Sequence, residues 1–469
     1  MSGYSSLSYF IPEILLFATA IGLLLIISYK KIPTGIEFSV ISIGLISAML
    51  ALVCTPHSES HGIFSNLLVW DSYGHIIKIF LTIIAGAVLI IYRQDRKSLS
   101  TPSSDYGVPF LILIFGAFII VTANHLIALF IALQLIHIAG FLIAQIANDD
   151  HISSLAAWQD FIFMLITSLI MLMGVTLIYS ATGTFKISEI GRILSALTRL
   201  DFPLIFAIVM ILFGFTYSVT GIFRLQWTLK IYRTIPASNR LVLLTIPQFA
   251  EIAALIRLFN FNPGQISEAQ PVSLALGIFA VATLTFPILW LMKKHDPVDT
   301  FNITATAQIG FGLLALGTLC PTGNVAALFH QLVIIISLIA FTAGELIPES
   351  NKKYTRLIQI IFLASLIGIP ITAGFPAKYL VFSSLVKQAP WFYFLLAIGI
   401  GSAALMLIGY GRLVRQNISA QPHPLRSPGH GAKTITILRV VLLLALIWGG
   451  IYWTHLTNYI QSILTFYIP

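Results

Sequence analysis

The sequence predicts an all-α polytopic membrane protein with about fourteen transmembrane helices. Of its 469 residues, 58% are hydrophobic and only 9% are charged, which excludes an ordinary soluble domain. Apolar runs long enough to cross about 30 Å of hydrocarbon recur along the whole chain. The net charge of +9 comes from Lys and Arg dispersed among the loops, without clusters of exposed aromatic residues, so we expect no nucleic-acid partner.

The apolar runs define the predicted helices in order. The first run has no basic segment before it and is long enough to span, so we expect a retained helix and not a cleaved signal. The predicted spans are 9–28, 36–54, 74–92, 108–123, 125–147, 160–182, 202–222, 238–259, 272–292, 302–320, 325–346, 357–386, 391–411 and 435–465.

The distribution of basic residues orients these helices. With this count, most of the 26 Lys and Arg residues, Arg224 among them, fall on one side of the membrane, and residues 412–433 form the longest loop there. That side is the cytoplasm by the positive-inside rule. We therefore expect an integral protein of the bacterial inner membrane with both termini on the non-cytoplasmic side. The few basic residues assigned to that other side are Lys78, Lys186, Arg192, Arg199, Arg257 and Lys387.

The twelfth run contains an interruption. Pro370 and Pro376 cannot donate to the helical ladder, and Gly374 lowers the cost of leaving it, so we predict a helix break here. Lys378 follows the break near the middle of the run, where an ammonium costs several kcal/mol unless it faces a partner or water. The seventh run also ends in a polar segment, 224–230. Two broken helices five positions apart are typical of inverted-repeat transporters.

Other polar residues lie inside the predicted helices. We interpret the neutral residues Gln134, Gln159, Ser218 and Gln308 mainly as interhelical hydrogen-bonding groups, and Gln248 shares a helical face with Glu251. Ionisable groups at this depth are costly to keep, and they predict a proton path instead. The candidates for that path are Lys378, Glu251, His137 and His330.

The sequence offers little other chemistry. It has no phosphate-binding glycine loop, dinucleotide fingerprint or nucleophile elbow, so we assign no catalytic residue and no cofactor to this chain. Cys54 and Cys320 do not form a metal-binding spacing. We expect both to be plain thiols, with a small chance of pairing, and no metal site.

Several motifs resemble the antiporter-like subunits of respiratory complex I (NADH:quinone oxidoreductase), and most closely the N subunit, the counterpart of mitochondrial subunit 2. Residues 368–379, GIPITAGFPAKY, are similar to the GIPxxAGFxGKF signature of that subunit. Weaker matches in the right order are GVTLIYSATGT at 174–184, WT at 227–228 and QIGF at 308–311. The resemblance implies fourteen helices with inverted repeats and broken helices 7 and 12.

In that family a glutamate, several lysines and a histidine form a charged, hydrated axis thought to move protons. Aligning the motifs places neutral residues at most of these positions, and only the lysine at 378 remains. The family's PFHxWxPDxY segment reads IFRLQWTLKIY at 222–232. Because a carboxylate and its lysine partner are lost together, no unpaired buried charge results. The neutralised positions are Gln134, Gln159, Ser218, Gln248 and Gln308.

The resemblance implies a membrane-arm subunit. Either the bundle is retained for assembly with its proton relay largely dismantled, which we favour slightly, or it also takes part in a degenerate proton translocation through His137, Glu251 and Lys378. NADH, flavin, iron-sulfur clusters and quinone would be bound by other subunits, and the partners would be further hydrophobic subunits and lipids. The alternatives are a subunit of a membrane-bound hydrogenase, a multisubunit cation/proton antiporter or an inorganic-carbon uptake complex, or a stand-alone transporter. The resemblance also implies four units along the chain. They are the first three transmembrane helices (1–104), a first antiporter-like repeat (105–260), a second antiporter-like repeat (261–415), and the cytoplasmic loop with the C-terminal helix (416–469).

Overall fold

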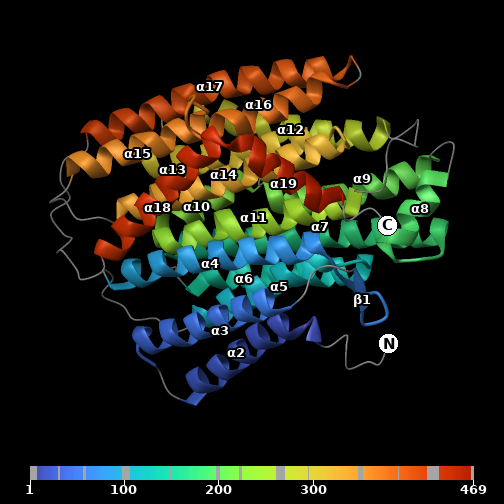
Figure 1. Cartoon of the computed structure of the whole chain (residues 1–469), viewed down its shortest axis with the longest axis horizontal. Helices are drawn as coiled ribbons and strands as arrows, with labels where there is room; N and C mark the ends of the chain where they lie inside the picture. Colours follow the sequence, from blue (N-terminus) through green and yellow to red (C-terminus); the bar gives the residue numbers. More distant parts are fainter. Residues whose placement is uncertain are drawn as a thin grey trace.

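The computed structural model describes residues 8–29, 32–55, 60–97, 106–146, 150–196, 201–220, 224–259, 270–293, 295–346, 352–388, 390–419 and 432–465. Within these residues the protein is a bundle of helices with one short β-hairpin (Figure 1). The helices run side by side along the long axis, and the chain crosses the bundle from α2 and α3 to α17.

The first part of the bundle contains four helices and the hairpin, in which His61 pairs with Trp70. The elements are α2 (Ile11–Tyr29), α3 (Thr34–Cys54), β1 (His61–Ile63), β2 (Leu68–Trp70), α4 (Ser72–Lys97) and α5 (Gly107–Thr122).

The middle part has six helices. They are α6 (Leu126–Ile146), α7 (His151–Thr182), α8 (Ile187–Ala196), α9 (Phe202–Thr220), α10 (Leu225–Thr234) and α11 (Ala237–Phe259). The seventh predicted span, 202–222, is helix α9, and the polar segment after it forms the separate helix α10. Residues 221–223 between the two helices lie outside the described part of the chain.

The last part has eight helices. They are α12 (Gln270–Leu291), α13 (Pro297–Leu316), α14 (Pro321–Glu345), α15 (Lys352–Ile367), α16 (Gly374–Val386), α17 (Phe392–Ser419), α18 (Ala432–Ile451) and α19 (Trp453–Thr465). The break predicted in the twelfth span is confirmed, because α15 ends at Ile367 and α16 begins at Gly374.

The polytopic helical fold is confirmed, although the spans are not uniform. Ten of the described helices are long and apolar enough to cross a membrane. Four predicted spans differ from these: α5 and α9 are shorter, the pair α15 and α16 is interrupted, and α13 carries Asp299, Asn302 and Gln308 among its apolar residues.

Several features of the fold were not predicted. The β-hairpin was missed because each strand has only three residues. The ten-residue helix α8 was missed because it is too short to span, and its residues are half polar. Helix α17 continues to Ser419, inside the segment expected to be an irregular loop, while residues 420–431 of that segment lie outside the described part.

Contacts between connections sort the helix ends into two groups. At one end, which we call the hairpin end, the backbone N–H of Asn124 donates to Leu67 O, and that of Leu126 donates to Phe185 O. At the opposite end, which we call the basic end, Arg240 pairs with Glu345 at 3.1 Å. These contacts join only connections that the sequence assigned to the same side of the membrane.

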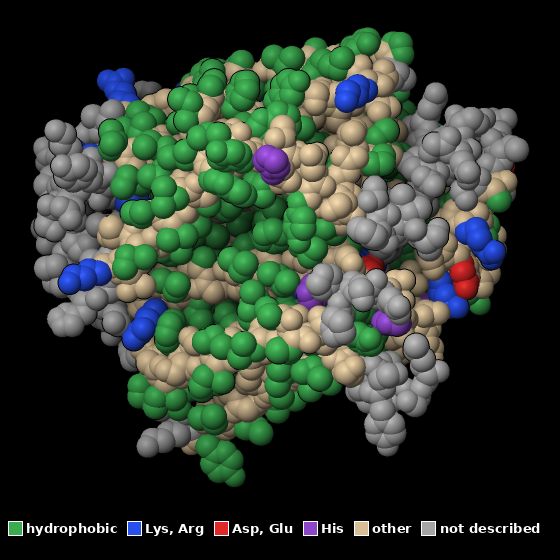
Figure 2. All heavy atoms as spheres, in the orientation of Figure 1, with side chains coloured by type: hydrophobic (Ala, Val, Ile, Leu, Met, Phe, Trp, Pro, Cys, Tyr) green, Lys and Arg blue, Asp and Glu red, His purple; other side chains and the backbone are tan. Residues whose placement is uncertain are grey.

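The surface is apolar along the middle of the bundle. In Figure 2, hydrophobic side chains cover the middle of the face shown, and Lys and Arg side chains lie toward its two ends. The central helices are α11 and α14, since 89% of the apolar stretch of each is buried, compared with 28% for α2 and 22% for α18. A membrane would therefore contact α2 and α18 and leave α11 and α14 surrounded by protein.

Two basic residues that the sequence assigned to the non-cytoplasmic side are buried. Lys78 is 1% exposed and pairs with Glu13 of α2. Arg257 is also 1% exposed, and its guanidinium donates two hydrogen bonds of 2.8 Å to the carboxylate of Asp71. The sequence placed both residues on the non-cytoplasmic side but did not predict their burial, because each charge has its partner far away in the sequence. Cys54 and Cys320 are both free thiols.

Candidate functional site

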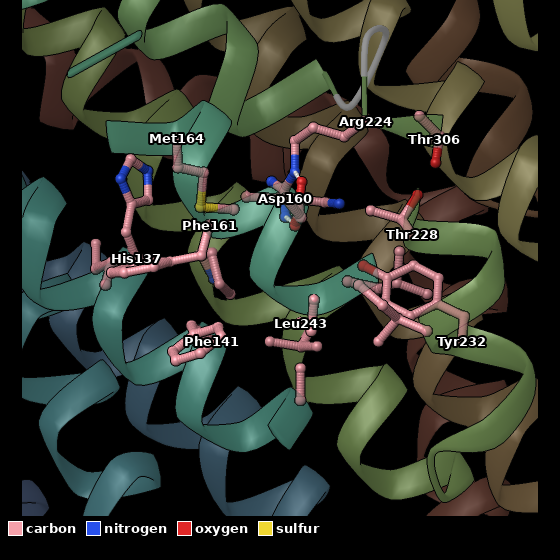
Figure 3. A pocket seen from close by; sticks show the side chains of 18 of the residues that line it. His137, Phe141, Asp160, Phe161, Met164, Arg224, Thr228, Tyr232, Leu243 and Thr306 are labelled. Carbon is pink, nitrogen blue, oxygen red and sulfur yellow. Dashed lines mark hydrogen bonds and ion pairs between the residues drawn. The ribbon is translucent and has the colours of Figure 1, made fainter. Parts of the chain in front are cut away.

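A cavity lies between α6, α7, α10, α11 and α13 (Figure 3). Water-sized molecules can occupy about 70 Å³ of it, whereas a single buried water needs about 10–15 Å³ by the same measure. The cavity extends from Glu251, in the middle of α11, to Ala144, two residues before the basic end of α6. It can therefore hold several waters that connect the bundle centre with the basic end. Its polar lining consists of His137, Asp160, Arg224, Thr228, Tyr232, Gln248, Glu251 and Thr306.

An ion pair forms the charged centre of this cavity. The guanidinium of Arg224, directly before α10, donates two hydrogen bonds of 2.7 Å to the carboxylate of Asp160 on α7. The Asp160 and Arg224 side chains are only 8% and 15% exposed. A bidentate pair fixes both side chains and lets two charges remain away from bulk solvent.

Sequence reasoning missed this pair. Arg224 was counted on the cytoplasmic side, and its burial in the cavity wall was not predicted. Asp160, the first residue of the predicted span 160–182, was not chosen as a site residue. The available signal was an acid and a base, each at the end of an apolar run on the same predicted side.

The cavity brings together residues from two other helices. His137 on α6 is 3% exposed, and Glu251 on α11 is fully buried. Gln248 lies one turn before Glu251, so both side chains project from the same face of α11 into the cavity. Imidazole and carboxylate groups around a water-sized space can exchange protons with that water.

Three other residues predicted on helices α6, α7 and α9 are not among the described residues that line the cavity. Gln134 donates a 2.8 Å hydrogen bond to the Ser168 hydroxyl, which joins α6 to α7. Gln159 is exposed on the surface of α7, and its neighbour Asp160 faces the cavity because consecutive helical residues differ by about 100°. The side chain of Ser218 lies outside the described part of the structure.

A second polar centre surrounds Lys378 on α16. The ammonium donates hydrogen bonds of 2.9 Å to Leu366 O and 2.8 Å to Ile367 O, at the end of α15. It also lies 5.1 Å from the ring centroid of Phe311 on α13. A cation at a helix C-terminus neutralises the carbonyl dipoles there, so the helix break itself provides a counter-charge for the buried lysine.

Glycines make this break possible. Gly368 has φ +91°, and its N–H and that of Ile369 donate to Ala364 O, which closes the C-terminus of α15. Gly374 approaches α15 so closely that a Cβ there would lie 1.7 Å from Ser365 O. Pro376 falls in the first turn of α16, where the missing N–H costs nothing. Pro370 lies between the two helices.

Helix α13 separates the two centres. Its Thr306 lines the cavity, whereas Gln308, two residues further, is fully buried on another face. The Gln308 amide nitrogen donates hydrogen bonds of 2.7 Å to Leu366 O and 2.7 Å to the Tyr410 hydroxyl. Gln308 and Lys378 therefore share the carbonyl of Leu366.

Polar atoms without partners concentrate on α13 and α14. Among the described residues, neither ring nitrogen of His330 has a hydrogen-bond partner, and the same holds for both amide atoms of Gln331 and of Asn302. The carbonyl oxygen of Gln308 is also unpaired there. Leaving such a group dry costs about 1–3 kcal/mol, so these sites favour buried water. His330 lies beside Phe311, with ring centroids 5.6 Å apart, so Phe311 contacts both His330 and Lys378.

The arrangement suits proton transfer better than metal chemistry. In the described part of the chain, no group of three or more His, Cys, Asp or Glu side chains could hold a metal ion. It contains two groups of buried titratable side chains. One group lines a cavity large enough for water, and the other lies beside polar atoms that have no hydrogen-bond partner among the described residues.

Comparison with known proteins places the chain among membrane subunits. Residues 123–405 match the family described as NADH:quinone oxidoreductase/Mrp antiporter, TM. The NADH-quinone oxidoreductase subunit N 2 of Sorangium cellulosum is 24% identical and aligns with 96% of this chain and 97% of its own. The subunit N of Bacillus anthracis is 25% identical, covering 87% of this chain and 85% of the relative.

Solved structures share the fold. A chain of respiratory complex I from Thermus thermophilus superposes with a TM-score of 0.75 at 18% identity and covers 94% of this chain and 97% of its own. A chain of an archaeal membrane-bound sulfane sulfur reductase gives 0.80 at 17% identity, with 99% and 98% covered. A chain of the Mrp complex of a Dietzia species gives 0.80 at 16% identity, covering 98% of this chain and 52% of that one. Because the family match spans more than half of the sequence, the chain belongs to the transmembrane NADH:quinone oxidoreductase/Mrp antiporter family.

Proposed function

We propose that this chain is a membrane-arm subunit of a complex I-like NADH:quinone oxidoreductase, where it takes part in assembly and in a degenerate proton translocation. Near full-length similarity to proteins named subunit N supports this function. NADH, flavin, iron-sulfur clusters and quinone would then be bound by other subunits. The chain would contact other hydrophobic subunits of the complex and membrane lipids.

The observation that carries the proposal is the pair of polar centres on either side of α13. The cavity holds Asp160, Arg224, His137 and Glu251, and the second centre holds Lys378. Each such group is costly to keep at membrane depth, and two of them are ion-paired in the cavity wall. A bundle that served packing alone would be more stable with apolar residues of similar volume at these positions.

The proposed proton route enters at the basic end. Water in the cavity would exchange protons with His137 and Glu251. Proton transfer from the cavity beside Thr306 to Lys378 would need water, because the side chains of α13 that separate the cavity from Lys378 are neutral. The unpaired oxygen of Gln308 and the two ring nitrogens of His330 would bind that water.

The chain would lie in the bacterial inner membrane. The excess of Lys and Arg at the basic end supports a cytoplasmic location for that end. The start of α2 contacts the hairpin through Tyr9, whose ring is 5.5 Å from Trp70, and α19 contacts the first turns of α4. Both ends of the described chain would therefore face the non-cytoplasmic side. The four units 1–104, 105–260, 261–415 and 416–469 remain our proposed division.

A second candidate is a subunit of another ion-coupled membrane complex. The TM-scores of 0.80 to the sulfane sulfur reductase and Mrp chains are slightly higher than the 0.75 to the complex I chain, so the fold does not separate these assemblies. Genes next to this one distinguish them. Quinone-reductase subunits as neighbours favour the first function, and antiporter, hydrogenase or carbonic-anhydrase-like neighbours favour the second.

Co-purification tests the proposal directly. A tagged chain solubilised in mild detergent should comigrate on a native gel with several hydrophobic subunits, and mass spectrometry should identify complex I-type quinone-reductase subunits among them. A stable monomer or homodimer would contradict membership in any such complex. A set of antiporter or hydrogenase subunits would replace the first function by the second.

A further inference from the structure

A line of charged and titratable side chains follows one face of α4, outside the cavity and the Lys378 centre. Asp71, His75 and Lys78 are spaced by four and three residues, so they share a helical face. All three are buried, with exposed fractions of 4%, 4% and 1%. Lys78 lies about 9 Å along α4 from its start, at 1.5 Å per residue.

Lys78, the last residue of this line, forms an ion pair with Glu13 of α2. Its ammonium donates to one oxygen of Glu13, and Glu13 is fully buried. The other oxygen of Glu13 has no hydrogen-bond partner among the described residues. The surroundings are aromatic, since the ammonium lies 5.1 Å from the ring centroid of Trp70 and 5.8 Å from that of Phe118.

Titratable groups lie around Trp70, between the ion pair and the hairpin end. The Tyr9 ring lies 5.1 Å from His61 on β1 and 5.5 Å from Trp70, and the His75 ring contacts Trp70 at 5.1 Å. The other charged groups nearby are Asp71 and Arg257, which pair with each other. Helix α5 carries no titratable side chain between Gly107 and Thr122, and Glu37 of α3 lies beside the N-terminus of α5, toward the basic end.

The pair is separate from the cavity but lies at a similar depth. The cavity lining comes from α6, α7, α10, α11 and α13, and none of it comes from α2, α4 or α5. The Tyr73 hydroxyl donates to Ala253 O, and Phe80 contacts Phe249, so the segment of α4 around Lys78 lies beside the segment of α11 that contains Glu251. A carboxylate and an ammonium this deep are expensive to keep.

We propose that Glu13 and Lys78 form a proton-binding site that exchanges protons with the hairpin end of the bundle. The proton binds the second oxygen of Glu13 and converts the carboxylate to a carboxylic acid, while Lys78 remains an ammonium. Its release restores the ion pair. The site belongs to the N-terminal helices and does not depend on which complex the chain joins.

Infrared difference spectroscopy of the purified protein, in whichever assembly carries it, tests this inference. A pH jump should give a protonated-carboxyl band in the wild type, and Glu13→Gln should remove that one titrating carboxyl per chain. Glu37→Gln is the matched control, because Glu37 is equally buried but accepts the N–H of Gly107. The control should keep the Glu13 band. A Glu13→Gln spectrum identical to the wild type would overturn the proposal.

Variants that remove the charge of Glu13, of Lys78 or of both distinguish a proton-binding site from an ion pair that only stabilises the fold. Lys78→Met should change the pH range over which the carboxyl band appears, because it removes the neighbouring positive charge. The double variant Glu13→Gln/Lys78→Met should regain thermal stability lost in the single variants, since no unpaired charge remains. The site requires the band to stay absent in this double variant. A wild-type band that persists in Lys78→Met at an unchanged midpoint would overturn the coupling of the two residues.

Discussion

The Asp160–Arg224 pair makes a quantitative prediction about the cavity. Asp160→Asn removes the carboxylate from a guanidinium that donates two 2.7 Å hydrogen bonds to it. Breaking a buried pair by removing one partner costs about 3–5 kcal/mol. Because the two side chains are 8% and 15% exposed and the cavity can hold water, we expect the lower end, about 3 kcal/mol. Arg224→Gln should cost a similar amount.

A double-mutant cycle isolates this interaction. The free energies of unfolding of the wild type, both single variants and the double variant would be measured by denaturant titration in the same detergent. The Asp160→Asn/Arg224→Gln double variant should recover much of the loss, with a coupling energy of about 2 kcal/mol or more. Gln159→Leu is the matched control on the exposed neighbour and should change stability by less than about 0.5 kcal/mol. Additive losses within about 0.5 kcal/mol would refute the proposed ion pair.

Three further predictions concern other parts of the molecule. Gly374→Ala should prevent stable folding, because its Cβ would lie 1.7 Å from Ser365 O, whereas Gly401→Ala, with no atom within 4 Å, should fold normally; detergent-solubilised yield by size-exclusion chromatography compares them. Gln308→Leu should destabilise by about 1–3 kcal/mol in a denaturant titration, because it leaves the Tyr410 hydroxyl without its donor; an unchanged midpoint would disprove that role. Arg257→Lys should lower the thermal midpoint measurably, since lysine cannot reproduce the two bonds to Asp71, and an unaltered melting curve would count against the bidentate geometry.

Much of the bundle was predictable because membrane helices are determined by local sequence. An apolar run must satisfy its own backbone hydrogen bonds in lipid, so its length alone predicts a span. The interruption before Lys378 was predictable for the same reason, since proline and glycine act on the backbone where they stand. The positive φ of Gly368 follows from that chemistry.

The ion pairs were not predictable, because their partners are distant in the sequence. Arg257 and Asp71 are 186 residues apart, and Arg224 and Asp160 are 64 apart. Without those partners, a charge near the end of an apolar run resembles a loop residue, so the sequence did not predict the burial of Lys78, Arg257 and Arg224. The orientation of α7 about its own axis could not be predicted from the sequence either. Gln159 and Asp160 are adjacent, and only the packed structure shows which of them faces the cavity.

The central claim is that Lys378 remains a working member of a proton path whose other family positions have become neutral. Its most direct test is proton translocation by the parent complex in reconstituted vesicles, with Lys378→Ala compared with Lys387→Ala, an exposed lysine after α16. We predict that both variants assemble and that only Lys378→Ala loses coupled proton movement. Unchanged pumping by an assembled Lys378→Ala complex would contradict the account and would leave Lys378 as a cap of helix α15.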